Sequence, residues 1–475
     1  MRRLTIIMIG LLLAIRCLAA THYVVTNGTP GWIGAADPYT NWATAGTNII
    51  DVVNAAMTNT TTRIVWVTNG TYYPTNVIVI TNALTLKSVN GRDATILAGQ
   101  GSLTTNRCLY NVGYDTIIDG FTVTNYYVVG QYGAVGSYVG GISILNCLFA
   151  GNSNVQATTE AEYGGGVYIS GLTGYPTVTN CVFSNNYSYN GGAGLAISTV
   201  SSAKVENCVF YGNRISADYA VGGGACYFPA SNLIISNCAV INNKSKLNGA
   251  GFYFPAPYTN NKILNCSLIG NIASGANYDG NSGGAIKCGG GSLLIANCVI
   301  VSNISPYFGG GVYGNGATIR NCLIAQNTAT NGGGIWLTNS AIENCTIVSN
   351  YAKNYGGGLC MNGANCRGTN NIVYFNTAGT SANNFTNTAG NTGLHYSCVI
   401  PAVDGTRNIT NDPSLLDLTG GNYRLSGTSL CVNAGLNANW MTNAVDLDGR
   451  SRIRYGTVDM GAYEVICGGT IYGFH

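Results

Sequence analysis

Charged residues are scarce in this chain of 475 residues. Asp, Glu, Lys and Arg make up 8% of it, about a third of the share in a typical globular domain. There are 21 basic and 18 acidic residues, and Arg2, Arg3 and Arg16 lie in the first twenty positions. The remainder is therefore neutral overall, which excludes sequence-independent nucleic-acid binding because that requires a basic surface.

Two further shortages exclude other classes. The only histidines are His22, His395 and His475, and they have neither zinc-ligand nor triad spacing. The 66 glycines have no period of three, which excludes collagen. Disorder is excluded as well, because 46% of the residues are hydrophobic and the net charge is close to zero.

Long apolar runs are absent after the N-terminus. Residues 4–15 form an apolar run that follows Arg2 and Arg3, and the small residues Ala19 and Ala20 close it. This pattern predicts an export signal over residues 1–20, and hence a secreted, cell-surface or outer-membrane-associated protein. An uncleaved membrane anchor is the alternative, but the run is shorter than the ~20 residues of a spanning helix.

An Asn-Cys pair recurs along the middle of the chain, with a further asparagine five residues after each cysteine. Successive cysteines are 23 to 34 residues apart, and a glycine cluster with an apolar triplet lies between them. The cysteines are Cys147, Cys181, Cys208, Cys238, Cys266, Cys298, Cys322 and Cys345. The trailing asparagines are Asn152, Asn186, Asn213, Asn243, Asn271, Asn303, Asn327 and Asn350. Such a period is typical of a solenoid.

Each repeat contains short strand patterns and no helical periodicity. In residues 176–183, Cys181 and Phe183 share one face, and Val178 joins that face only if the chain bends at Asn180. Asparagine tolerates the left-handed conformation of such a bend. We therefore expect three strands per coil: one after the glycines, one ending at the bend, and one starting at the cysteine. Stacked coils of this kind form a parallel β-helix.

In-register stacking explains the composition. Equivalent residues lie about 4.8 Å apart, so like charges would repel while asparagines could hydrogen-bond. The cysteines should be buried thiols, because parallel column neighbours suit neither a disulfide nor a tetrahedral metal site. Better disulfide candidates are Cys360 with Cys366 and Cys398 with Cys431. Arg320 and Glu343 should form an ion pair between neighbouring coils.

The two ends differ from the repeat. Residues 21–62 are predicted to form an N-terminal cap, with a short amphipathic helix over residues 48–56 whose apolar side chains are Ile49, Ile50, Val53 and Ala56. The β-helix should run from residue 63 to 390, followed by a linker (391–411), a closing module (412–464) and a tail (465–475).

The repeats resemble those of chlamydial polymorphic outer membrane proteins, through Phe-x-x-Asn segments such as residues 149–152 and a Gly-Gly-Ala-Ile segment at residues 283–286. The closing module resembles the choice-of-anchor Q domain, through Asp412-Pro413, the Asp-Leu-Asp-Gly-Arg segment at residues 446–450, and the Asp-Met-Gly-Ala-Tyr-Glu segment at residues 459–464. This second resemblance implies export and a surface or extracellular role, but no particular reaction.

The outer face of the first sheet is the candidate binding surface, by analogy with carbohydrate-active β-helices. Its column should contain the second residue after each glycine cluster: Tyr168, Ala196, Cys226, Tyr253, Lys287, Tyr313, Trp336 and Cys360. Of these, Tyr168, Tyr253, Lys287, Tyr313 and Trp336 could bind sugars through aromatic faces and one cation. The alternative is an aromatic ladder that only shields the sheet.

Catalysis would require paired ionisable groups. Asp218 and Asp279 lie in long turns before the glycine clusters, with Lys244 in the coil between them. Two coils separate the aspartates by about 10 Å, slightly more than the ~6.5–9.5 Å of inverting glycosidases. Solvated loop charges are the alternative. No metal site or cofactor is expected.

The sequence thus predicts an all-β protein: a right-handed, single-stranded parallel β-helix of about ten coils, similar to the pectate-lyase solenoid. We expect an exported scaffold that presents an elongated face to a polysaccharide or another cell-envelope component. The alternative is a polysaccharide lyase or glycoside hydrolase that uses the same face. We expect neither a nucleic-acid partner nor a transmembrane segment after removal of the signal.

Overall fold

The computed structural model describes residues 20–466 except residues 28, 30, 60–62, 102–105, 130–132, 140, 156–162, 217–220, 276–282, 381–382 and 389–392. The predicted export signal, apart from Ala20, lies outside the described residues, and so do residues 467–475 of the predicted tail.

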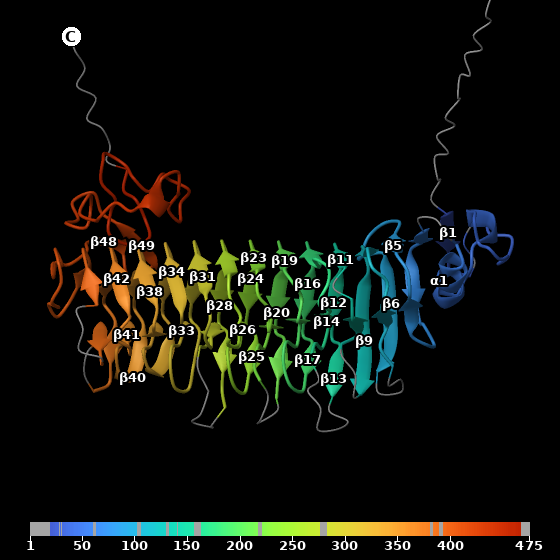
Figure 1. Cartoon of the computed structure of the whole chain (residues 1–475), viewed down its shortest axis with the longest axis horizontal. Coiled ribbons are helices and arrows are strands. Elements are labelled where there is room, and N and C mark those ends of the chain that lie inside the picture. The colour runs from blue at the N-terminus through green and yellow to red at the C-terminus, as the bar shows by residue number, and fades with distance from the viewer. Residues whose placement is uncertain are drawn as a thin grey trace, which may run out of the picture.

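The chain folds as an elongated, right-handed parallel β-solenoid (Figure 1). Each coil contributes one strand to each of three long sheets, which confirms the predicted architecture. The first strand after the glycine cluster belongs to sheet C, the next to sheet A, and the strand after the cysteine to sheet B. A fourth, narrow sheet D follows the trailing asparagine and was not predicted.

Sheet A contains β1 (Ala20–Val24), β2 (Arg63–Val67), β5 (Thr85–Ser88), β8 (Thr116–Asp119), β11 (Ile142–Leu145), β15 (Thr177–Thr179), β19 (Ala203–Glu206), β23 (Leu233–Ser236), β27 (Asn261–Leu264), β31 (Leu293–Ala296), β34 (Ala317–Arg320), β38 (Ala341–Glu343), β42 (Arg367–Thr369) and β46 (Leu394–His395). Sheet C contains β4 (Ile78–Ile80), β7 (Leu109–Asn111), β10 (Val135–Ser137), β14 (Val167–Ser170), β18 (Leu195–Ser198), β22 (Cys226–Tyr227), β26 (Phe252–Phe254), β30 (Ile286–Cys288), β33 (Val312–Asn315), β37 (Ile335–Thr338), β41 (Leu359–Met361) and β45 (Phe385–Asn387).

Sheet B contains β3 (Gly70–Tyr72), β6 (Thr95–Gly101), β9 (Thr122–Val129), β12 (Leu148–Ala150), β16 (Val182–Ser184), β20 (Val209–Tyr211), β24 (Ala239–Ile241), β28 (Ser267–Ile269), β32 (Val299–Val301), β35 (Leu323–Ala325), β39 (Thr346–Val348), β43 (Ile372–Tyr374) and β47 (Cys398–Val399). Sheet D contains β13 (Ser153–Val155), β17 (Tyr187–Ser188), β21 (Arg214–Ile215), β25 (Lys244–Ser245), β29 (Ile272–Ala273), β36 (Thr328–Asn331), β40 (Tyr351–Tyr355) and β44 (Thr377–Ala378). The long strand β9 pairs with β12 of sheet B and with β13 of sheet D.

The coils stack in register, so equivalent side chains form straight columns. Phe149, Phe183 and Phe210 are successive partners in sheet B. Their rings stack inside the solenoid, with centroids 5.1 Å and 4.8 Å apart, and all three are buried. Column stacking therefore builds one continuous apolar core along the axis.

The predicted bend at each Asn-Cys pair is confirmed. All eight asparagines before the column cysteines have a left-handed backbone, with φ between 50° and 56°. This conformation turns the chain from sheet A to sheet B, and asparagine adopts it at lower cost than most residues. The cysteine that follows then points inward, and all eight column cysteines are buried free thiols.

The trailing asparagines form a ladder inside the solenoid. Asn243, for example, is buried; its side-chain nitrogen donates to Asn271 Oδ1 at 3.0 Å, and its Oδ1 accepts from Asn213 Nδ2 at 2.9 Å. The same bond links each member of the repeat to the next, from Asn152 to Asn350. The expected asparagine column is thus confirmed, and it satisfies polar groups that burial would otherwise destabilise.

The other predicted pairs have different outcomes. Arg320 Nε lies 2.6 Å from Glu343 Oε2, which confirms the ion pair between coils. Cys360 and Cys366 are free thiols on different faces, since Cys360 lies in an outer column and Cys366 in the core. Cys398 and Cys431 share a small apolar cluster but are also free thiols, and Cys398 Sγ donates to Asn411 O at 3.2 Å.

The N-terminal cap contains the predicted helix, α1 (Ile49–Met57), after the short 3₁₀ helix η1 (Trp42–Thr44). Asn48 caps α1, because its side-chain oxygen accepts the backbone N–H of Ile50. The buried residues include Val52, which the sequence pattern did not predict, while Ile50 is only partly buried. The helix covers the core beside β1, β2 and β4, so the open end of the first coil is closed.

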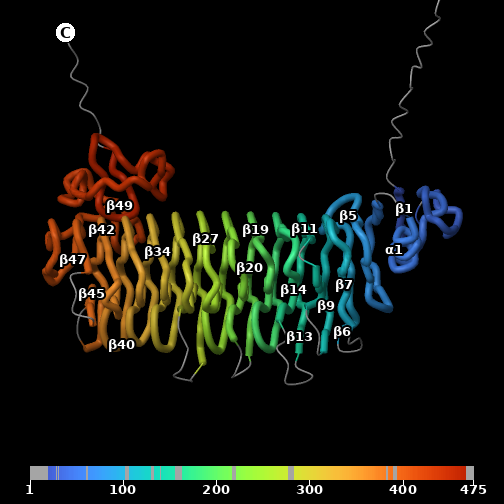
Figure 2. The backbone as a smooth tube through the Cα atoms, in the orientation of Figure 1, coloured from blue at the N-terminus to red at the C-terminus, as the bar shows by residue number. Residues whose placement is uncertain are grey.

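The predicted end of the solenoid at residue 390 is wrong, and so is the prediction that the C-terminal module closes that end. The solenoid continues beyond residue 390, because β46 and β47 extend sheets A and B within the predicted linker. Residues 412–466 do not close the end of the solenoid. They pack on its side, against the outer face of sheet B (Figures 1 and 2).

The module is also less β-rich than predicted. Its described elements are the antiparallel pair β48 (Leu415–Asp417) and β49 (Asn422–Leu425) and the 3₁₀ helix η2 (Asn439–Met441). Turns hold the remainder together. Asp446 Oδ1, for instance, accepts the backbone N–H groups of Asp448 and Arg450.

Candidate functional site

The outer column of sheet C is the predicted binding surface, and the strand register defines its members. The register joins Val79, Tyr110, Gly136, Tyr168, Ala196, Tyr227, Tyr253, Lys287, Tyr313, Trp336, Cys360 and Thr386. All five predicted ligand-binding residues therefore lie in one column. Lys287 is its only charged member.

Cys226 was wrongly predicted to lie in this column. Cys226 is fully buried and faces the core, while Tyr227 pairs with Ala196 and Tyr253 on the outer face. The prediction counted from the last glycine of its cluster. In this coil Ala225 occupies the position that the final glycine has in the preceding coil, because Gly194 N donates to Ala225 O. Counting two residues from Gly224 therefore stopped one residue before Tyr227.

Much of this column is covered. Tyr168, Ala196 and Tyr227 form a cluster with Tyr163 and Val221 from the preceding turns, and Tyr168 is only 7% exposed. Trp336 is 6% exposed and lies 4.4 Å from Phe308, between ring centroids. A sugar ring cannot stack on these faces without displacing the turns, so Tyr168 and Trp336 mainly shield the sheet.

Lys287 lies between two tyrosines in the middle of the column. Its Nζ is 5.6 Å from the ring centroid of Tyr253 and 5.4 Å from that of Tyr313, and it donates to Asn248 Oδ1 at 2.6 Å. Burial disfavours the charged amine and lowers the pKa of Lys287 to about 8. A substantial fraction of this amine is therefore neutral in mildly alkaline solution.

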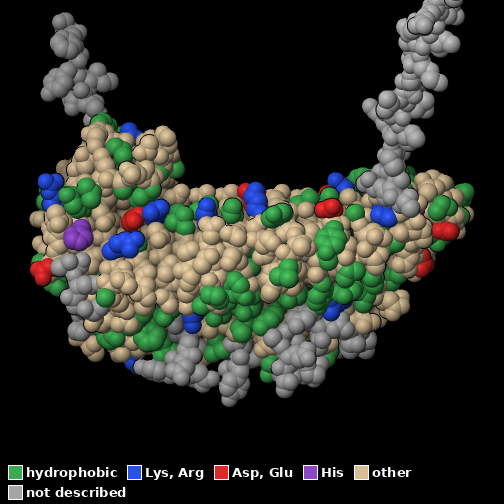
Figure 3. Space-filling model, in the orientation of Figure 1, with side chains coloured by type: hydrophobic (Ala, Val, Ile, Leu, Met, Phe, Trp, Pro, Cys, Tyr) green, Lys and Arg blue, Asp and Glu red, His purple; other side chains and the backbone are tan. Residues whose placement is uncertain are grey.

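A more open hollow lies at the N-terminal end of the same face. Val77, Val79, Arg107, Tyr110 and Tyr138 line a shallow depression of about 510 Å³. The Arg107 guanidinium lies 5.3 Å from the ring centroid of Tyr110 and 5.7 Å from that of Tyr138. Val79 is 37% exposed. Hydrophobic side chains, tyrosine included, also gather over this side of the molecule in Figure 3.

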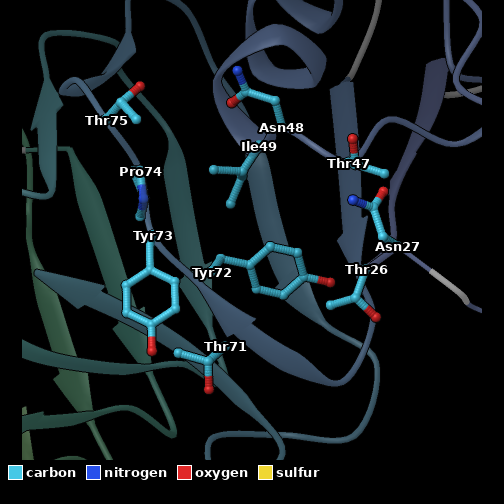
Figure 4. A pocket seen from close by; sticks show the side chains of 10 residues that line it. All are labelled: Thr26, Asn27, Thr47, Asn48, Ile49, Thr71, Tyr72, Tyr73, Pro74 and Thr75. Carbon is cyan, nitrogen blue, oxygen red and sulfur yellow. The ribbon is translucent and has the colours of Figure 1, made fainter.

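A second pocket is lined in part by residues that come just before the hollow in the sequence. It has a volume of about 310 Å³, and its lining includes residues 71–75, two positions before the hollow begins at Val77. In Figure 4 the Tyr72 ring extends towards Thr26, and Asn48 and Ile49 lie at the start of α1. The other lining residues are Asn27, Thr47, Thr71, Tyr73, Pro74 and Thr75. Hydroxyl and amide groups dominate this lining, which contains no charged side chain.

Comparison with known proteins agrees with the fold. Residues 132–303 match the model of the family described as right handed beta helix region. This segment is a right-handed β-helix region. Over 201 residues, 41% of the chain, the sequence is 27% identical to the metabotropic glutamate receptor-like protein R of Dictyostelium discoideum. The match spans only 11% of that protein's length.

Three solved structures resemble the β-helix at low sequence identity. One is a pectate lyase, at 16% identity and a TM-score of 0.41, covering 94% of this chain and 96% of that chain. Another is the Dettilon tailspike protein, at 12% identity and a TM-score of 0.36, covering 77% and 68%. A rhamnogalacturonan lyase matches at 12% identity and a TM-score of 0.27, covering 86% and 96%.

Of the three predicted catalytic residues, the structure describes only Lys244. Asp218 and Asp279 lie outside the described residues. Lys244 belongs to β25 of sheet D, where it is exposed and pairs in register with Arg214, so it does not lie in the sheet C column. Among the described residues, no group of three or more His, Cys, Asp and Glu is placed to hold a metal ion. No helix in the described part of the chain could span a membrane.

Sequence reasoning missed the hollow because the early coils of the β-helix lack the Asn-Cys signal. Tyr110 and Tyr138 precede the first Asn-Cys pair, so the repeat gave no frame for them. A usable signal was present in the strand pattern, since Leu109-Tyr110-Asn111 alternates as the later sheet C strands do. The polar pocket had no sequence signal, because its lining comes from separate segments of the chain.

Proposed function

We propose that this chain is an exported β-helix scaffold that binds a glycan along the outer face of sheet C. The single observation that carries the proposal is the hollow in which Arg107 lies between Tyr110 and Tyr138. Aromatic faces can stack on sugar rings, and the buried Arg107 guanidinium donates to the Tyr138 hydroxyl at 3.4 Å and so orients that ring. The neutral pocket at the start of α1, lined by hydroxyls and amides, suits a separate polyhydroxylated unit.

The proposal assigns unequal roles to the predicted residues. Tyr110 and Tyr138 would bind the ligand, and Arg107, which is only 7% exposed, would hold the two rings in place. Tyr253, Lys287 and Tyr313 would extend the surface along the axis. Tyr168 and Trp336 are too covered to contribute a free aromatic face. The covered cluster of Tyr168, Ala196 and Tyr227 lies between these two groups of ligand-binding residues, so a ligand that reaches both must be long enough to pass over it, because column members repeat at about 4.8 Å.

Replacing Tyr110 with Ala should weaken glycan binding by about tenfold or more, because about 1.4 kcal/mol of contact energy corresponds to a factor of ten. A glycan array on the purified protein would first identify a ligand, and calorimetric titration would then give the dissociation constants. Tyr114→Ala is the matched control, since Tyr114 is 55% exposed in the turn after β7 and outside the column. Equal affinities for both variants would disprove the assignment.

A carbohydrate-active enzyme is the second candidate, and Lys287 is the observation that favours it. A lysine whose pKa lies near the working pH can act as a general base. If it does, turnover of a polysaccharide should rise with pH through about 8, as the amine loses its proton. Reducing-sugar or unsaturated-product release would be measured across a polysaccharide panel, and Lys287→Ala should abolish it. Turnover that persists in that variant would exclude Lys287 as the base.

A further inference from the structure

The closing module binds the side of the solenoid through a repeated feature. Asn321, Asn344 and Asn370 lie at the left-handed bends between sheets A and B, and all three are fully buried. Their side-chain nitrogens donate to backbone oxygens of the module, at 2.9 Å to Val445, 3.1 Å to Asp459 and 2.9 Å to Leu436. The asparagine row therefore binds carbonyl groups of a polypeptide.

Apolar side chains on sheet B complete this interface. Leu323, Ala325 and Val348 of β35 and β39 pack against Tyr423 and Ala462 of the module. Further contacts reach β32 and β43, through Val301 and Ile372 respectively. The footprint of the module on sheet B thus extends over β32, β35, β39, β43 and β47.

The five preceding strands of sheet B carry the same two features outside the footprint of the module. Only their first edge is met by another segment among the hydrogen bonds of the described residues, where Arg92 donates to Cys147 O and Asn180 O. We name the outer face of β12, β16, β20, β24 and β28, with its asparagine edge, the bare flank. Its edge asparagines have the same left-handed backbone, with φ between 53° and 56°, but are exposed; they are Asn146, Asn180, Asn207, Asn237 and Asn265. On the outer face of sheet B, Tyr211 is 45% and Ile269 is 38% exposed, and both belong to one column.

The module also exposes apolar side chains on its free surface. Leu416 is 56%, Leu430 59% and Tyr455 65% exposed. Within β48, Leu415 packs into the clusters shared with the solenoid, and the adjacent Leu416 points the opposite way because strand side chains alternate. The chain thus exposes apolar side chains both on the bare flank and on the free surface of the module.

The shape of the molecule allows both to be covered at once. The module projects from one long side near the C-terminal end. The same side is open beside β11, β19 and β23, the sheet A strands that lead into exposed edge asparagines of the bare flank (Figures 1 and 2). The bare flank and the module's footprint each comprise five strands of sheet B. The chain after residue 20 is neutral overall, so two copies would repel each other little.

We propose that the bare flank binds the closing module of a second copy of this chain. The two copies lie antiparallel about a two-fold axis, so that each module covers the flank of the other. Such an isologous interface closes on itself and yields a dimer. The interface between the two copies continues the one that each module makes within its own chain. The side-chain nitrogens of Asn207 and its neighbours would donate to carbonyl groups of the partner.

The test is the mass of the full chain in solution, measured by sedimentation and by light scattering across a concentration series. We expect twice the chain mass. Ile269→Lys and Tyr211→Lys on the flank, and Leu430→Lys on the module, should each weaken association at least tenfold. Asn207→Gly keeps the left-handed bend and should weaken it less. Leu172→Lys is the control, because Leu172 is 79% exposed in the turn between sheets C and A.

Three results would overturn the proposal. The first is a single-copy mass at every concentration. The second is a dimer that the flank and module variants leave intact, and the third is growth beyond two copies, which a closed two-fold arrangement forbids. All the substituted side chains are exposed, so circular dichroism should show unchanged folds, and the Asn207→Gly variant provides a measurement that adds no charge to the flank.

Discussion

Replacing Asn243 with Ala should destabilise the solenoid by about 4 kcal/mol, because each buried polar group left without a partner costs about 1–3 kcal/mol. The Asn243 side-chain nitrogen donates to Phe210 O at 2.9 Å as well as to Asn271. Its oxygen accepts both the backbone and the side-chain N–H of Asn213. Alanine would leave the Phe210 carbonyl and two Asn213 donors unsatisfied inside a site that excludes water.

Denaturant unfolding, followed by circular dichroism, would measure this loss. Asn242→Gly is the matched control: Asn242 is the preceding residue, it is exposed, and its φ of 55° suits glycine. We expect the control to change the stability by less than about 1 kcal/mol. Because each coil contacts mainly its neighbours, a loss in one coil could also split the unfolding into two steps. An Asn243→Ala variant as stable as the control would contradict the role assigned to the interior ladder.

The periodic part of the fold could be predicted because each feature repeats with one physical cause. A single bend at Asn180 was uncertain on its own, but eight Asn-Cys pairs required the same solution, and all eight bends are left-handed. The buried cysteines followed from that bend. In-register stacking also predicted the Arg320–Glu343 pair, since equivalent positions of neighbouring coils must meet.

Prediction failed where one residue of the repeat is substituted, and where the structure depends on packing between segments far apart in sequence. Ala225 in place of a glycine moved the predicted column by one residue, from Tyr227 to Cys226. The site of the closing module could not be predicted, because its contacts join residues far apart in sequence, such as Asn321 and Val445. The exposure of the sheet C column likewise depends on turns such as that of Tyr163, whose packing no periodicity encodes.

The attachment of the module depends on Arg452, a fully buried arginine. One guanidinium nitrogen donates to Asn321 Oδ1 of the solenoid at 3.2 Å. The other donates to Gly461 O at 3.0 Å and lies 3.2 Å from Glu464 Oε1. Burial raises the pKa of Glu464 to about 8 and lowers that of Arg452. Among the described residues, Arg452 is the only fully buried arginine of the module, and it lies against the asparagine row.

Arg452→Met should destabilise the docked module by about 3–5 kcal/mol, because three buried acceptors lose their donor and each buried polar group left without a partner costs about 1–3 kcal/mol. Asn321, Gly461 and Glu464 would lose their donor, and the module should separate from sheet B before the solenoid unfolds. Hydrogen exchange at the backbone of β35 and β39, and proteolysis within residues 400–411, would both detect that separation. Arg424→Met is the matched control, because Arg424 pairs with Asp448 at 2.6 Å but its side chain is 41% exposed, so its loss should cost less than about 1 kcal/mol. Equal protection in the two variants would mean that apolar contacts alone hold the module in place.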